Sequence, residues 1–200
     1  MADLVIKPSS GNLVLKDDQN ATRMTVATST GATTLTNQVF PDGHIIKTSS
    51  VFYDNSATQV VISADATWTE IHSGLRLTHT AESASNILLM TFSTAFCSPN
   101  ANNLYGAKFY NQSGSADITI PSASGSRRRQ HWSMRVTPND ANDQSMLNMS
   151  MRHVAGSTSA ITYTIMFYTQ SPDVQFFSST LSDANGFSAG GTFIIYEIQA

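Results

Sequence analysis

The chain has 200 residues, a formal net charge of −3 and a charged fraction of only 12%, about half that of an average protein. This balance excludes a broad electrostatic attraction to nucleic acid or to anionic membranes. No apolar run approaches the roughly 18 residues of a membrane-spanning helix, and the first residues, MADLVIKPSSG, lack the apolar region of a signal peptide. We therefore expect synthesis in the cytoplasm, no membrane insertion and no nucleic-acid partner.

The chain opens with a hairpin pattern over residues 11–26, GNLVLKDDQNATRMTV, in which two β-type runs flank the polar turn DDQN. A lone two-stranded hairpin is marginal in water. Three copies around an axis, or a docking partner, would cover its apolar residues and remove its free strand edges. The residues expected to serve attachment or trimerisation in this way are Leu13, Val14, Leu15, Met24 and Val26.

A boundary is predicted where residues 30–43 turn polar and end in Pro41-Asp42-Gly43. This divides the chain into an N-terminal β segment over residues 1–38 and a larger β domain over residues 39–200. Throughout the larger part, short strand-like runs alternate with turns rich in Gly, Asn, Asp and Pro, and helical periodicity is missing. The pattern predicts an all-β fold, a sandwich or a barrel.

Several runs also predict which side chains share a face. Residues 161–168 alternate, with Ile161 and Tyr163 on one face and Thr162 and Tyr168 on the other. Residues 86–96 and 191–199 are instead apolar on both faces. Strands covered on both faces fit the interior of an oligomer, and a central strand beneath a loop is the alternative.

The carboxylates give little reason to expect an enzyme. A glycan-cleaving enzyme needs two carboxyl groups facing a cleft, but the close pairs Asp17/Asp18 and Asp140/Asp143 lie in turn sequences, where Asp stabilises the turn. No phosphate-binding loop, GxSxG elbow or GxGxxG fingerprint is present. We therefore expect no enzymatic activity and no cofactor.

The five histidines lack the HxH and HxxxH spacings of a metal site on one element. His131 and His153 lie in strand-like runs, where three copies could bring one histidine per chain to a shared axis. Surface or half-buried histidines are the simpler alternative, and no metal is predicted. The single cysteine, Cys97, cannot form an intrachain disulfide and is expected to be a small packed side chain.

The basic run Arg127-Arg128-Arg129 stands out in this lightly charged chain. It could contact an anionic host glycan or form ion pairs between subunits, for which Arg is well suited. If the run were a strand, Arg127 and Arg129 would share one face and Arg128 the other. Aromatic rings that could add a sugar-stacking platform, or else fill the core, are Tyr105, Tyr110 and Trp132.

Residues 11–26 resemble the start of short structural proteins of tailed phages, especially marine and cyanobacterial ones, in which a GxLxLKDxxGxxRLTV-like segment precedes a β domain. One departure is Gln19-Asn20-Ala21, which stands where the pattern has a Gly in the turn. The segment ATWTEIHSGLRLTHTAESASNILLMTFSTAF extends the resemblance, which covers most of the chain. The matching positions in this segment are Trp68, Ile71, Gly74, Leu75, Ser85, Ile87 and Leu88.

The resemblance implies a subunit of a trimeric tail or capsid fibre or spike. It implies an N-terminal piece that attaches to other virion proteins, followed by an antiparallel, jelly-roll-like β-sandwich knob. We therefore expect a non-enzymatic structural protein located in the virion, a homotrimer, with host surface glycan as a candidate partner. The alternatives are a soluble carbohydrate-binding β-sandwich that uses the arginines and aromatic rings, and a glycan depolymerase.

Overall fold

The computed structural model describes residues 11–16, 19–20, 22–27, 33–35, 41–54, 60–63, 66–97, 103–122, 125–135, 144–170, 174–177 and 190–200. The chain divides into two compact units, Met1–Pro41 and Asp42–Ala200, where the sequence had suggested a boundary after residue 38. The prediction of an all-β protein is confirmed: nearly every described element is a strand. No helix within the described ranges has the length and apolarity to cross a membrane.

The first unit contains an antiparallel sheet of β1 (Leu13–Lys16), β2 (Thr22–Val26) and β3 (Thr33–Leu35), in that order. The predicted hairpin is β1 and β2, and β3 is a third strand that the polar composition had concealed. The turn residue Asn20 has φ +66°, a left-handed conformation that Asn adopts more readily than most residues other than Gly. Its side-chain oxygen accepts a hydrogen bond from Lys16 Nζ at 3.0 Å. Asn therefore replaces the Gly of the phage-type pattern.

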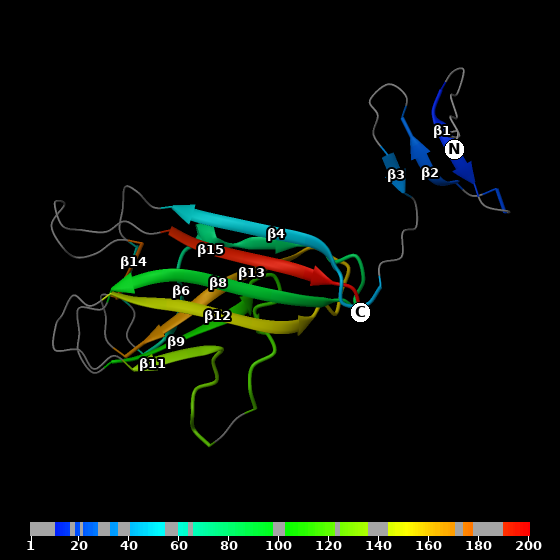
Figure 1. Ribbon diagram of the computed structural model, residues 1–200. Helices are drawn as coiled ribbons and strands as arrows, with labels where there is room; N and C mark the ends of the chain where they lie inside the picture. Colours follow the sequence, from blue (N-terminus) through cyan, green and yellow to red (C-terminus); the bar gives the residue numbers. More distant parts are fainter. Residues whose placement is uncertain are drawn as a thin grey trace, which may run out of the picture. The chain divides into compact units, whose positions relative to one another are not determined.

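The second unit holds the remaining strands (Figure 1). Its described helical structure is one 3-10 turn, Ser73–Leu75. The strands are β4 (Ile45–Asp54), β5 (Val60–Ile62), β6 (Trp68–Glu70), β7 (Leu77–His79), β8 (Ile87–Cys97), β9 (Leu104–Asn111), β10 (Ala116–Asp117), β11 (Trp132–Arg135), β12 (Gln144–Val154), β13 (Ile161–Thr169), β14 (Val174–Phe176) and β15 (Gly190–Ile198).

These strands form two antiparallel sheets of four rows each. In the first, which we call the β8 sheet, the order is β4 and β5, then β15 and β14, then β8, then β12. In the second, the β9 sheet, the order is β6 and β7, then β13, then β9, then β10 and β11. Two strands share a row where they follow one another along the same edge, as β14 and β15 do beside β8 and as β6 and β7 do beside β13.

Numbered along the chain, the rows have the order 1-8-3-6 in the β8 sheet and 2-7-4-5 in the β9 sheet. Row 1 therefore pairs with row 8, row 2 with row 7, row 3 with row 6 and row 4 with row 5. This is the path of a long antiparallel ribbon rolled around a core, the jelly roll. The expected jelly-roll-like sandwich is confirmed.

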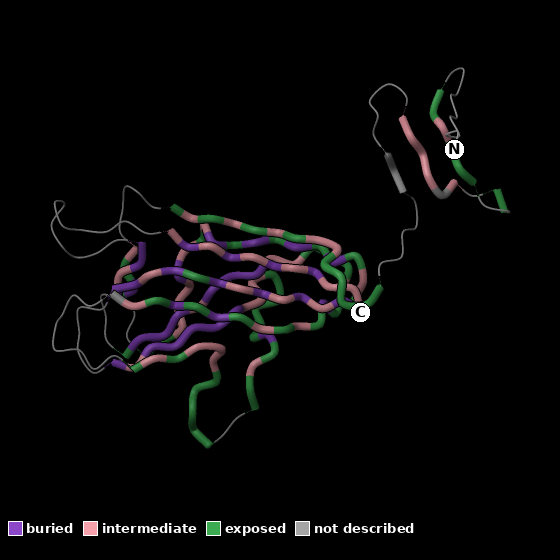
Figure 2. The backbone as a smooth tube through the Cα atoms, in the orientation of Figure 1, coloured by how far each residue is buried: buried purple, intermediate pink, exposed green. Residues whose placement is uncertain are grey.

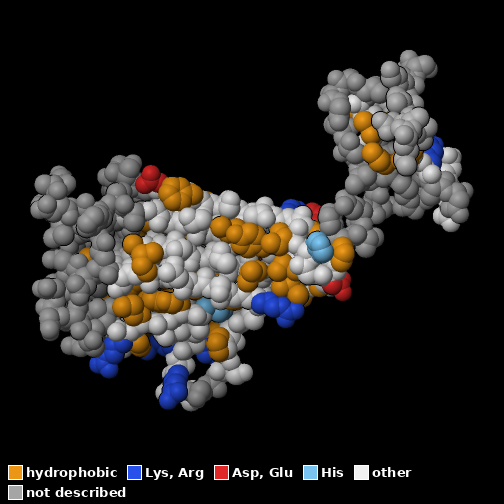
Figure 3. Space-filling model, in the orientation of Figure 1, with side chains coloured by type: hydrophobic (Ala, Val, Ile, Leu, Met, Phe, Trp, Pro, Cys, Tyr) orange, Lys and Arg blue, Asp and Glu red, His pale blue; other side chains and the backbone are white. Residues whose placement is uncertain are grey.

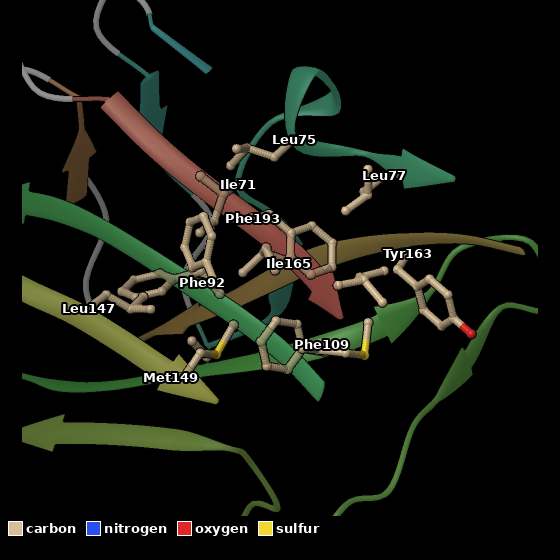
Figure 4. Packing of buried hydrophobic residues seen from close by; sticks show 14 of the residues in the cluster. Ile71, Leu75, Leu77, Phe92, Phe109, Leu147, Met149, Tyr163, Ile165 and Phe193 are labelled. Atoms are coloured by element: carbon tan, nitrogen blue, oxygen red, sulfur yellow. The ribbon is translucent and has the colours of Figure 1, made fainter. Parts of the chain in front are cut away.

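The core lies between the two sheets, where side chains from both inner faces meet (Figure 4). Phe92 and Phe193 from the β8 sheet pack over Phe109 and Ile165 from the β9 sheet. Burial alternates along β8 and β15, so that every second residue is buried (Figure 2). The face assignments predicted for residues 161–168 agree with this pattern, because Tyr163, Ile165 and Phe167 face the core.

An aromatic cluster fills one end of this core around Phe96, which is 1% exposed. Its ring centroid lies 5.4 Å from Tyr105, 5.7 Å from Phe167 and 5.9 Å from Phe176. The contacts with Tyr105 and Phe167 are edge-to-face, an arrangement that aromatic pairs favour. Phe96 thus joins the β8 sheet to the β9 sheet.

Replacing Phe96 with Ala should lower the free energy of unfolding by about 3–5 kcal/mol, because the change removes a buried ring and leaves a cavity. Chemical denaturation at low protein concentration measures this value. The matched control is Phe52→Ala, at a ring that is 63% exposed, where a change within about 0.5 kcal/mol is expected. Equal effects at both positions would contradict the assignment of Phe96 to the core.

Candidate interaction surfaces

The outer face of the β8 sheet is nearly uncharged. The register across β4, β15, β8 and β12 aligns most of its side chains in four rungs. The charged residues on this face are Arg152 on β12 and Asp54 at the end of β4, both on edge strands. The rungs are Ile45–Ile198–Ile87–Val154, Thr48–Tyr196–Leu89–Arg152, Ser50–Ile194–Thr91–Ser150 and Phe52–Thr192–Ser93–Asn148.

This face combines apolar side chains with a shallow hollow. Ile45, Phe52 and Val154 are 56%, 63% and 51% exposed. The hollow has a volume of about 300 Å³ and is lined mainly by the small polar side chains of the last two rungs, with Ile194 beside them. Figure 3 shows this side of the molecule, where hydrophobic and uncharged atoms fill the middle and charged side chains lie near the edge. Such a surface is typical of a protein contact.

The five predicted attachment residues of the first unit divide between the two faces of its sheet. Leu13 pairs with Val26 and Leu15 with Met24, so these four share one face, while Val14 pairs with Thr25 on the other. Val14 is 40% exposed and Leu15 is 48% exposed, and the other three are half-buried. The small sheet thus leaves apolar area uncovered, as expected of a segment that needs a partner.

The outer face of the β9 sheet has a different character, because charged and aromatic side chains cover it. Lys108 forms an ion pair with Asp117 and lies 4.4 Å from the ring centroid of Trp68. Nearby, Glu70 accepts hydrogen bonds from Arg76 and from Thr164. The bond from Arg76 is the main cause that lowers the pKa of Glu70. The charges of these side chains are thus balanced by partners within the chain.

The basic run lies beside this face, and its structure corrects one prediction. Residues 127–129 are not a strand, so the expected separation of Arg128 from Arg127 and Arg129 is wrong. All three arginines are exposed, and they line one hollow of about 270 Å³ together with Pro121, Ser122, Gln130 and Ser133. No ion pair joins any of the three to a carboxylate within the described residues.

Tyr168 lies beneath Arg128. The guanidinium carbon of Arg128 is 4.3 Å from the ring centroid of Tyr168, a cation–π distance. Tyr168 is 1% exposed, and its hydroxyl has no hydrogen-bond partner among the residues that the structure describes. Its ring centroid lies 5.6 Å from that of Trp68. Arg128, Tyr168, Trp68 and Lys108 therefore follow one another across the outer face of the β9 sheet.

Gly106 has no side chain and so leaves room at the edge of the arginine hollow. It pairs with Tyr168 on one side and with Ser133 on the other. A Cβ atom at this position would clash with the side-chain oxygen of Gln130, so the carboxamide of Gln130 lies directly over the glycine. Gly106 therefore lets Gln130 line the hollow beside Ser133.

The aromatic residues proposed as a platform do not come together. Tyr105 is 0% exposed and packs in the core, so its assignment as a surface residue is wrong. Trp132 also faces inward, because it pairs with Ala107 and its ring lies 5.8 Å from Phe96. Tyr110 alone is on the outer face, half-buried and 5.7 Å from Lys108 Nζ. The sequence missed Trp68 and Tyr168, since nothing in their local pattern links them to the arginines.

His131 and His153 both contact Thr119, which adjoins the segment that lines the arginine hollow. His131 Nδ1 accepts a hydrogen bond from the Phe109 N–H at 3.0 Å, and Nε2 lies 3.3 Å from the Thr119 carbonyl oxygen. His153 Nδ1 lies 2.8 Å from Thr119 Oγ1. Within the described part of the chain, no group of three potential metal ligands occurs. The two histidines therefore hold Thr119 in place.

A further series that the sequence did not reveal joins Ser49, His79 and Glu197. Ser49 Oγ lies 2.9 Å from His79 Nδ1, and His79 Nε2 lies 3.1 Å from Glu197 Oε2. The side chains of His79 and Glu197 are 1% and 0% exposed. The other carboxylate oxygen of Glu197 accepts from the Glu82 N–H and from Asn86 Nδ2.

This series has the residue types of a hydrolytic triad, but its geometry fits a structural role. A triad needs a serine that substrate can reach and donors for a developing oxyanion. Here the histidine and carboxylate are enclosed, and the carboxylate is committed to Glu82 and Asn86. Burial outweighs the nearby Glu197 and lowers the pKa of His79, so a neutral ring bridges Ser49 and Glu197. The series ties β4, β7 and β15 together.

Two other candidates need only brief mention. The carboxylate pairs Asp17/Asp18 and Asp140/Asp143 lie outside the described residues. Cys97 is a free, buried side chain.

The chain matches no protein-family model and no curated protein.

Replacing Tyr168 with Phe should raise the free energy of unfolding by about 1 kcal/mol, because an unpartnered buried hydroxyl costs roughly 1–3 kcal/mol. Chemical denaturation of the two proteins measures the difference. The matched control is Tyr196→Phe at a half-exposed ring, which should leave stability unchanged. A loss of stability in Tyr168→Phe would mean that the hydroxyl is satisfied.

The unfolding free energy should fall as the pH drops below 6.5. Burial lowers the pKa of His131 and of His153 from the ordinary value of 6.5. The unfolded chain then binds more protons than the folded one, so acidification through this range favours unfolding. A proton on His131 Nδ1 would also break the bond from the Phe109 N–H.

Denaturation at pH 7.5, 6.5 and 5.5 measures this slope. His131→Asn keeps an oxygen acceptor near the Phe109 N–H and removes one titrating group, so its slope should be shallower. A parent protein whose stability is constant over this range would disprove the prediction.

Proposed function

We propose that this chain is a non-enzymatic structural subunit of a phage virion, part of a tail or capsid fibre or spike in which three copies associate. The outer face of the β8 sheet is the observation that carries the proposal. Its charged side chains, Arg152 and Asp54, lie on the two edge strands, and its exposed apolar side chains need a cover.

A second copy of the chain suits this face better than an unrelated charged partner. The middle of this face offers no charge pattern for a partner to match, and its Ser, Thr and Asn side chains both donate and accept hydrogen bonds. Four strands about 4.8 Å apart and about eleven residues long cover roughly 700 Å². This area approaches the roughly 800 Å² per partner of a standard specific interface.

The first unit fits the same proposal. Its four apolar side chains on one face, Leu13, Leu15, Met24 and Val26, are covered when copies of the small sheet meet or when the sheet docks on another virion protein. The phage-type motif lies in this unit, and such motifs precede β domains in the proteins that it resembles. We therefore assign attachment to other virion proteins, and a share of the trimer contacts, to the first unit, while the β8 sheet of the jelly-roll knob supplies the main contact between copies.

The described residues supply no argument for catalysis. The one Ser–His–carboxylate series is enclosed in the core, where its groups hold three strands together. Jelly rolls occur in viral capsid proteins and in lectins, so the fold alone does not choose between a virion subunit and a soluble carbohydrate-binding module. The arginine hollow is the observation that favours the second candidate.

The native mass of the purified chain, measured by light scattering, separates the two candidates. We expect a mass three times 21.6 kDa. Ile194→Lys should lower the mass toward that of one chain, because each copy would place a charge in the middle of the contact. Met166→Lys, a half-buried position on the outer face of the β9 sheet opposite Glu70, is the control and should keep the parent mass.

A parent protein that remains a monomer at micromolar concentration, or an Ile194→Lys protein with unchanged mass, would contradict self-association through this face. Location in the virion is tested separately, by mass spectrometry of purified phage particles. Recovery of the chain in a fixed ratio to the major structural proteins supports the proposal. Its absence from intact particles would overturn it.

A further inference from the structure

We propose that the hollow lined by Arg127, Arg128 and Arg129 binds a saccharide that carries an anionic group, a carboxylate, sulfate or phosphate. This site is separate from the self-association face, because its residues lie beside the β9 sheet and the self-association face lies on the β8 sheet. The proposal therefore holds for a monomer as well as for a trimer. A negative result for saccharide binding would therefore not contradict self-association, and a monomeric protein would not contradict saccharide binding.

The local charge is the first argument. Between Asp117 and Asp140 the sequence has four arginines and no carboxylate. Three of these arginines line one hollow, and no described acidic group pairs with them. Like charges held close together repel one another, and a bound anion would relieve this repulsion. Arg is also the side chain best suited to bind carboxylates, sulfates and phosphates with two parallel hydrogen bonds.

The fixed position of Arg128 is the second argument. Its guanidinium stacks over Tyr168 at 4.3 Å, and this cation–π contact orients a side chain that would otherwise be mobile. A guanidinium has five N–H donors, so Arg128 can contact the ring and still donate to a ligand. Tyr168 itself has a buried hydroxyl without a described partner. The cation is thus held on a rigid support before any ligand arrives.

The neighbouring side chains favour a sugar over an acidic peptide. Ser122, Gln130 and Ser133 line the hollow with hydroxyl and amide groups, which match the hydroxyls of a sugar ring. The half-exposed Trp68 lies beyond Tyr168, with Lys108 4.4 Å from its ring. A volume of about 270 Å³ is at the small end of ligand sites. One charged sugar unit fits there, and the chain of sugars would continue toward the half-exposed ring of Trp68.

The test measures binding of the purified chain to short oligosaccharides by calorimetry at near-physiological ionic strength. Polygalacturonate fragments present carboxylates and heparin fragments present sulfates, so the two arms identify the preferred anion. Dextran fragments test the need for charge, and polyglutamate of similar length tests the need for a sugar. We expect at least one anionic saccharide to bind with an affinity that falls as salt is raised. Dextran and polyglutamate should bind at least tenfold more weakly.

Variants locate the site. Arg128→Gln should weaken binding at least tenfold, whereas Arg152→Gln, at an exposed arginine on the other sheet, should leave it unchanged. Quenching of tryptophan fluorescence by the saccharide should be lost in Trp68→Phe, which leaves Trp132 in place. Thermal unfolding of each variant confirms that it is folded before its affinity is compared.

Three outcomes would overturn the proposal. These are the absence of binding to any anionic saccharide, equal binding to polyglutamate, and equal loss of affinity in Arg128→Gln and Arg152→Gln. The second would assign the arginines to an acidic protein segment, and the third would indicate attraction to the overall charge and not to a site.

Discussion

A sheet in a two-layer sandwich can cover only one of its faces with its own chain, and this constraint governs the whole jelly roll. The inner faces meet over Phe92, Phe193, Phe109 and Ile165. The outer faces then have to be stable in water or covered by something else. The β9 sheet meets the demand within the chain, through the ion pair of Lys108 with Asp117 and the contact of Lys108 with the Trp68 ring. The β8 sheet does not, because the middle of its outer face consists of aliphatic, aromatic and small polar side chains.

The two sheets therefore have outer faces of different character and different roles. A charged and aromatic face resists nonspecific association, while an uncharged face invites a matching partner. In the proposed assembly one face holds copies together and the region beside the other remains open to solvent and to ligands. The same division explains why three of the chain's arginines can gather at one place. The outer face of the β8 sheet, where added charge would weaken self-association, lies on the opposite side of the core.

Much of this organisation could be predicted from the sequence, because strand alternation reports directly on burial. Period-two patterns predicted the two faces of residues 161–168 and the first hairpin. The apolar side chains on both faces of residues 86–96 could also be recognised in the sequence. The sequence misled where that regularity failed. Arg127 to Arg129 are not a strand, so alternation does not separate them. Tyr105 has an aromatic ring that suits a core or a sugar platform equally, and only its neighbours decide. Ser49, His79 and Glu197 are brought together by row pairing, which no local pattern encodes.

The pairing of β4 with β15 also determines how the jelly roll would bear load. The chain passes from the first unit through Pro41 directly into β4, an edge strand that antiparallel pairing joins to β15 from Ile45 to Asp54. Tension applied to the N-terminal end of β4 along the strand would load the ladder between β4 and β15. The hydrogen bonds of the ladder lie across that axis, so they would resist in shear, many at once, and no single bond would take the whole force.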